Sequence, residues 1–167
     1  MRWISYFILA YLMLGLQIGL APYLKLGGDV RPNLVLLAVI FIAINAPRDA
    51  ALLGAFGLGV IQDLTTAQTL GVFAFSYALV AMFTVSTQQV VYRSHPLTHF
   101  SLAFVGSLVT GFVIILHDWR HGPRPVPVMI HFYSAVYSAV LAPIVLGVLD
   151  RIRRAFSFQS PRRRMRI

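Results

Sequence analysis

Cysteine is absent from the 167 residues, and only 11% of them are charged. The absence of thiols excludes disulfides, thiolate metal ligands and cysteine nucleophiles. An average soluble domain is about one-quarter charged, so this chain has too little charge for an ordinary water-exposed surface. Hydrophobic residues instead make up 58% of the chain, and its mean hydropathy is +0.77. Lipid is the solvent that fits this composition.

Acidic residues are also few, five against fourteen basic ones, which leaves a net charge of +9. That balance could indicate nucleic acid, but seven of the basic residues lie between Arg151 and Ile167, outside any apolar run. A basic segment beside a membrane span is typical of the cytoplasmic side. We therefore expect the lipid bilayer as a partner and no nucleic acid. The predicted domains are a transmembrane bundle, residues 1–155, and a basic cytoplasmic tail, residues 156–167.

Apolar runs predict an all-α, polytopic bundle of about six spans. A bilayer core needs about 20 apolar helical residues whose backbone amides are paired internally. The six segments are 3–24, 32–46, 50–64, 71–91, 98–116 and 128–149. We interpret the first as a retained span and not a signal peptide, because Pro22 directly follows the only small-residue cleavage site. Pro32 suits a first helical turn, and Pro143 predicts a kink.

The second and third segments are short. Fifteen residues at about 1.5 Å each cover roughly two-thirds of the hydrocarbon core. These helices must thin the bilayer, extend through their flanks or be sheltered by neighbours. We favour a tight hairpin packed inside the bundle. A re-entrant hairpin, leaving four full spans, is the alternative.

Basic residues in the connections predict the orientation. With the N-terminus inside, ten arginines lie on the cytoplasmic side, against one lysine and three arginines outside. Short loops rich in Lys and Arg stay in the cytoplasm. Both termini are therefore expected on the cytoplasmic side of the membrane.

Asp63 is the most informative ionisable residue, because it closes a stretch that carries no other charge after Asp49. A carboxylate near the end of a span is costly unless it reaches water or a partner. Gly59 lies four residues earlier, and a glycine there would let a second backbone approach and hold Asp63 away from lipid. One interpretation is a specific pairing role. The other places Asp63 among outer headgroups, at the start of a turn.

The run from His117 to His121 has two histidines four residues apart, a spacing that metal ligands use. Only His131 is offered as a third ligand, and histidine, tryptophan and arginine are ordinary at an external membrane interface. We therefore predict no metal site and no cofactor. No paired buried carboxylates, catalytic triad or phosphate loop can be recognised either, so we expect a protein that is not an enzyme.

Small residues recur at helical spacing in two spans. They are Gly15 and Gly19 in the first, and Ser134 and Ser138 in a repeated Tyr-Ser-Ala-Val in the sixth. Such stripes let helices pack closely in lipid. We expect them to pack mainly within the chain, with a partner's docking face as the alternative.

Residues 32–77 resemble the rod shape-determining family MreD. In that family the second helix opens with a proline and an apolar run, and the third carries a glycine-rich stretch that ends in Asp-Leu and is followed shortly by another glycine. The matching residues here are Pro32, Asn33, Gly54, Gly59, Asp63 and Gly71. The span count and the basic tail are similar as well. The segment from His117 to Pro127 does not map onto the family pattern.

The resemblance implies a non-catalytic scaffold subunit of the machinery for cell shape and peptidoglycan elongation. It implies MreC, a single-span membrane protein, as partner, with a RodA/penicillin-binding-protein synthase complex and MreB as further ones. It also implies a fold similar to the substrate-binding S components of energy-coupling-factor vitamin transporters. The alternative function is therefore such a vitamin-binding subunit, with a ligand lined by Trp119, His121, His131 and Tyr133.

Overall fold

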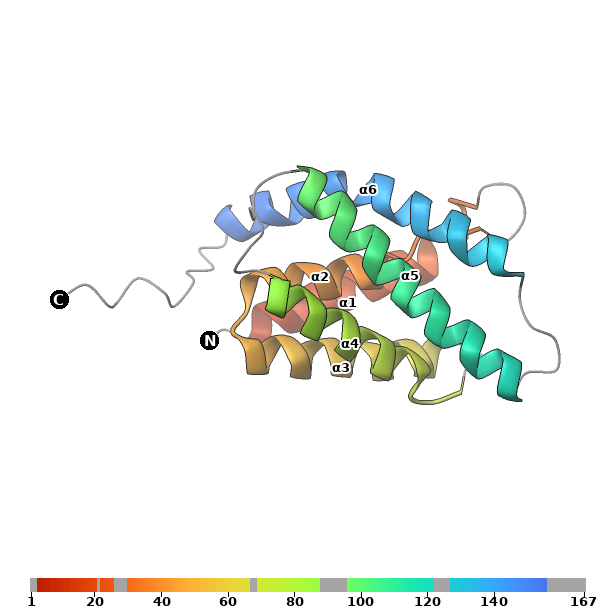
Figure 1. Ribbon diagram of the computed structural model, residues 1–167. Coiled ribbons are helices and arrows are strands. Elements are labelled where there is room, and N and C mark those ends of the chain that lie inside the picture. Colours follow the sequence, from red (N-terminus) through yellow and green to blue (C-terminus); the bar gives the residue numbers. More distant parts are fainter. Residues whose placement is uncertain are drawn as a thin grey trace.

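The computed structural model describes residues 3–20, 22–25, 30–66, 69–87, 96–121 and 127–155, and these form an all-α bundle (Figure 1). Six helices lie within those ranges. They are α1 (Trp3–Gly19), α2 (Leu34–Asn45), α3 (Arg48–Thr65), α4 (Val72–Thr87), α5 (Pro96–His121) and α6 (Val128–Ala155). In the described part of the chain, α5 and α6 are each long and apolar enough to cross a membrane.

Helix α2 is the centre of the bundle, because it contacts each of the other five helices. All eleven residues from Leu34 to Ile44 are buried. A helix that is apolar on every side needs an apolar surrounding on every side, and here its neighbours provide it. The prediction that the second segment is sheltered is confirmed, which explains how a helix of 12 residues is accommodated.

Helix α3 is longer than its predicted apolar segment. It extends through both flanks of its predicted segment, from Arg48 to Thr65, and reaches 18 residues. One face packs on α2 and α4, whereas Leu53, Phe56 and Leu64 are exposed. Thus only α2 is enclosed. The hairpin prediction holds for the α2–α3 pairing, but not for the burial of both helices.

Several predicted helix boundaries differ from those in the structure, and three of the differences have a clear local reason. Helix α2 begins at Leu34, because the side chain of Asn33 accepts the N–H of Leu36 as an N-cap, so Pro32 precedes the helix. Helix α1 ends at Gly19, before Pro22. Helix α5 continues to His121 through residues predicted as a loop, and the first helix breakers beyond it are Gly122 and Pro123.

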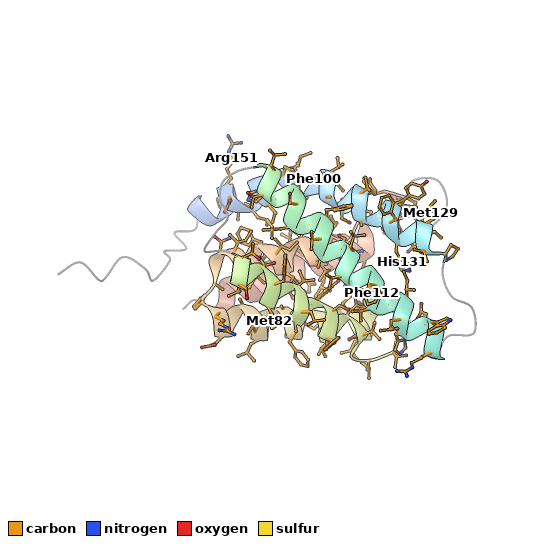
Figure 2. The ribbon with its side chains drawn as sticks, in the orientation of Figure 1. Met82, Phe100, Phe112, Met129, His131 and Arg151 are labelled. Carbon is orange, nitrogen blue, oxygen red and sulfur yellow. The ribbon has the colours of Figure 1, made fainter. Side chains whose placement is uncertain are left out.

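The two long helices pack mainly on each other, as α3 does on α4. Side chains such as Met82 and Phe112 point outward from the bundle (Figure 2), as expected for a lipid-facing surface. Small residues allow the close contacts inside. Ala103, Ala135, Ala139 and Ala142 are completely buried. Pro143 lies within α6, and residues 156–167, the predicted tail, fall outside the described residues.

Candidate functional site at one end of the bundle

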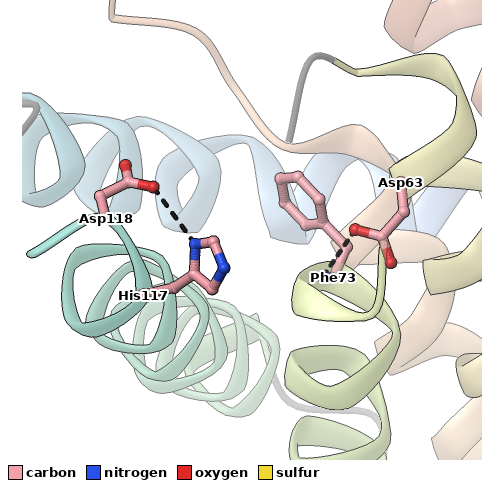
Figure 3. Close-up of polar contacts among 4 residues, drawn as sticks. All are labelled: Asp63, Phe73, His117 and Asp118. Carbon is pink, nitrogen blue, oxygen red and sulfur yellow. Dashed lines mark hydrogen bonds and ion pairs between the residues drawn. The ribbon is translucent and has the colours of Figure 1, made fainter. Parts of the chain in front are cut away.

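The carboxylate of Asp63 is bound by the start of α4. Backbone N–H groups of Gly71, Phe73 and Ala74 donate to its two oxygens over 2.9, 2.9 and 3.1 Å. Figure 3 shows the bond from Phe73. The first N–H groups of a helix have no partner within the helix and carry partial positive charge, which suits a carboxylate. Asp63 is only 2% exposed. The carboxylate is therefore paired, and the groups that pair with it belong to its own chain.

Gly59 brings α3 and α4 close enough for these bonds. A Cβ atom built on Gly59 would lie 2.3 Å from Cα of Ala74 and 2.6 Å from the carbonyl oxygen of Phe73. No side chain fits between two backbones at that separation. The close approach expected at Gly59 is present, one turn before the carboxylate that it positions.

The turn between the two helices is closed by local bonds. The hydroxyls of Thr65 and Thr66 both donate to the carbonyl of Gln62, at 3.0 and 2.9 Å, so they satisfy the end of α3. Gly71 has a φ of +104°, a conformation that residues with a Cβ rarely adopt. These features define the α3–α4 corner: Gly59, Gln62, Asp63, Gly71, Phe73 and Ala74.

A second polar group, the Asn33 cluster, surrounds the start of α2. The amide of Gln17 in α1 clamps the chain on both sides of Asn33. Its oxygen accepts the N–H of Leu34 at 2.7 Å, and its nitrogen donates to the carbonyl of Pro32 at 3.2 Å. The N–H of Asn33 donates to the hydroxyl of Ser138 in α6 at 2.9 Å.

Tyr77 connects the Asn33 cluster with the α3–α4 corner. Its hydroxyl donates to the side-chain oxygen of Asn33 at 3.1 Å, and its ring packs on that of Phe73, with centroids 5.6 Å apart. Tyr77 is completely buried. Five of the six motif residues, Pro32, Asn33, Gly59, Asp63 and Gly71, therefore belong to these two connected groups. Gly54 does not, since it faces Ile42 on the flank of α2.

Two residues of this site were missed from the sequence. Gln17 had a signal, because it is the one side-chain amide in the apolar run of α1, and an amide in lipid needs a partner. Tyr77 had none, because its bond to Asn33 joins positions 44 residues apart. Ser138 was expected only to pack a helix, yet it also accepts a backbone N–H.

The histidines of α5 and α6 form no metal site among the described residues. Nδ1 of His117 lies 3.6 Å from the carboxylate of Asp118 (Figure 3). His131 packs on Gly111 of α5, where a Cβ would meet it at 3.2 Å. Trp119 and Tyr133 are exposed, and the side chain of His121 lies outside the described residues.

The model of one protein family, rod shape-determining protein MreD, matches residues 1–152. The chain belongs to the MreD family. No curated protein and no solved structure gave a match. The matched region takes in both the α3–α4 corner and the Asn33 cluster. MreD proteins are polytopic membrane components, generally non-catalytic, with a role in rod cell-shape determination.

The bond from Tyr77 to Asn33 is tested by Tyr77→Phe. This substitution removes one neutral hydrogen bond while Asn33 keeps Leu36 as a donor, so we expect a loss of about 1 kcal/mol in the free energy of unfolding. Thermal unfolding in detergent measures it. Tyr133→Phe on the exposed side of α6 is the matched control and should leave the midpoint unchanged. Equal midpoints for the two variants would contradict the proposed bond.

Proposed function

We propose that this MreD-family chain is a non-catalytic scaffold of the bacterial inner membrane that binds the single transmembrane helix of an MreC-like partner. Through that partner it would join peptidoglycan synthases and MreB to one site of cell elongation. Family membership over residues 1–152 supports this proposal. The polar groups of the motif support it as well, because their bonds hold the bundle in one shape, which a docking surface requires.

The surface that fits a partner helix best is the outward stripe of α1. Gly15 and Gly19 have nothing within 4 Å of an added Cβ, and both are exposed. The prediction that this pair packs within the chain was therefore wrong, whereas Ser138 of the α6 stripe is fully buried. Exposed residues continue the stripe at helical spacing: Ile8, Tyr11, Leu12 and Ile18.

The inward face of α1 explains why its glycines point outward. Met13 and Leu14 are buried against the core, and Gln17 is fixed by its two bonds to the start of α2. Gly15 and Gly19 therefore face away from α2. Because lipid gives no hydrophobic drive for helix association, an open stripe with two glycines is where a second helix gains the closest contact.

The test is co-purification from the native membrane after Gly15→Leu combined with Gly19→Leu. Two leucines fill the stripe without touching the fold, so we expect unchanged unfolding and a reduction of at least about tenfold in partner yield. Gly147→Leu in α6 is the matched control, because Gly147 is also open and exposed. An unchanged yield would exclude this surface. Copies of an energy-coupling module in place of a single-span partner would favour the vitamin-transport alternative.

A further inference from the structure

The helices of the bundle fall into two groups by length. Helices α1, α3 and α4 have 17, 18 and 16 residues, which at about 1.5 Å each extend over about 24 to 27 Å. The apolar spans of α5 and α6 have 24 and 25 residues and extend over about 36 to 38 Å. The hydrocarbon core of a bilayer is about 30 Å thick. The first group is therefore too short for that core, and the second is too long.

Excess length and missing length are accommodated in different ways. A helix that is too long can tilt, and α5 lies obliquely across α4 (Figure 1). A helix that is too short gains nothing by tilting. It requires a thinner bilayer, flanking side chains that reach outward, or a neighbouring protein. Helix α2 is enclosed by the other helices, whereas α3 and α4 lie side by side at the edge of the bundle (Figure 1).

The missing length is largest on the outward side of α3. Its exposed large apolar side chains begin at Leu53 and end at Leu64, about 16 Å apart along the helix axis. Arg48 and Asp49 are exposed before them, and Thr65 is exposed after them. Arg48 can direct its charged group outward along the helix, but the side chain of Asp49 is too short to do the same. The apolar band of α3 is thus roughly half as thick as an ordinary hydrocarbon core.

The side chains on this side of the bundle suit lipid better than a second helix. The apolar side chains that α3 and α4 expose are large. Large side chains hold a neighbouring backbone at a distance, and close packing of helices in a membrane needs small ones. Flexible acyl chains can fill the spaces between them. The α3–α4 face consists of Leu53, Phe56, Ile61, Phe75, Met82 and Phe83.

We propose that the α3–α4 face holds a locally thinned bilayer and selects phospholipids with short acyl chains. Lipids with long chains must compress or bend to cover the same apolar band, and each ångström of mismatch costs free energy. On the side of α5 and α6, the longer apolar surface removes that selection. The selection depends on helix lengths and exposed side chains alone, so it needs no protein partner.

Tryptophan fluorescence can compare the lipids on the two sides of the bundle. The chain has two tryptophans, and both are first changed to phenylalanine. A single tryptophan is then introduced by Phe56→Trp in α3 or, as the matched control, by Phe112→Trp in α5; both positions are exposed. The full-length protein is reconstituted in brominated phosphatidylcholine mixed with unbrominated competitors that have short (dimyristoleoyl), intermediate (dioleoyl) or long (dierucoyl) chains. Relief of quenching measures how strongly each competitor binds beside the probe.

At position 56 we expect the short-chain lipid to bind about threefold more strongly than the long-chain lipid, and at position 112 we expect no such preference. Arg48→Leu combined with Asp49→Leu extends the apolar band of α3, so it should move the preference at position 56 toward the intermediate lipid. Arg120→Leu, at the exposed end of α5, should leave that preference unchanged.

The comparison of the two probes decides the outcome even if the leucine variants fail to fold. The same chain-length preference at positions 56 and 112 would overturn the proposal, and so would a preference for long chains at position 56. If no brominated lipid quenched the probe at position 56, a protein neighbour such as a second copy of the chain would cover the α3–α4 face in place of lipid. That result would also overturn the proposal.

Discussion

Replacing Asp63 with alanine should lower the free energy of unfolding by about 3 to 5 kcal/mol, because three backbone N–H groups at the start of α4 lose their acceptor together. Two of those groups, on Phe73 and Ala74, belong to buried residues. In a bundle surrounded by lipid, little water can replace the carboxylate. The midpoint of thermal unfolding in detergent is the measurement.

Asp63→Asn separates the geometry of this cap from its charge. Asparagine keeps one acceptor oxygen but turns an N–H₂ group toward donors, so its stability should fall between those of the wild type and the alanine variant. The alanine variant should also lower the yield of a co-purified MreC-like partner, because the start of α4 is no longer fixed. An unchanged yield at equal expression would contradict a role for the α3–α4 corner in the complex.

Gly59→Ala should lower the free energy of unfolding by an amount comparable to Asp63→Ala, although it adds only one methyl group. That methyl would lie 2.3 to 2.6 Å from backbone atoms of Phe73 and Ala74, so α3 and α4 must separate and the bonds to Asp63 must lengthen. We expect a loss of about 3 kcal/mol or more. Expression level and unfolding midpoint should both fall.

Gly57→Ala is the control for this prediction. Gly57 lies two residues earlier in α3 and has nothing within 4 Å of an added Cβ, so alanine there should be neutral or stabilising by up to about 1 kcal/mol through helix propensity. The double variant Gly59→Ala with Asp63→Ala should lose less unfolding free energy than the sum of the losses in the two single variants, because both substitutions disrupt the same contact. Equal stability of the Gly57 and Gly59 variants would contradict the close packing.

The buried central helix could be predicted from the sequence, whereas the ends of the helices could not. A run as apolar as Leu34 to Ile44 fits only an enclosed position, and the short length of α2 required shelter. The ends of helices depend on single caps such as Asn33, and such bonds are visible only once the chain is folded. Helix α5 continues to His121, because no helix breaker lies between Leu116 and Gly122.

Part of the site could be predicted in its residues, although Gln17 and Tyr77 were missed, and its contacts could not. Asp63 was recognisable as a carboxylate in need of a partner, yet that partner is backbone, which has no sequence signature. The small residues of α1 are exposed whereas Ser138 of α6 is buried, and this difference also depends on contacts that the sequence does not reveal. Both faces of α1 are apolar, so only the bonds of Gln17 to Pro32 and Leu34 determine which face turns inward.

Docking of a partner helix on the glycine stripe of α1, as we propose, is tested most directly by photo-crosslinking in the native membrane. A photoreactive residue replaces Ile18, which flanks Gly19 on the stripe, or Leu53, an exposed residue of α3. We expect a crosslink from position 18 to a single-span protein of the shape machinery, and lipid adducts alone from position 53. Lipid adducts alone from both positions, or the same protein crosslinked equally from both, would contradict it.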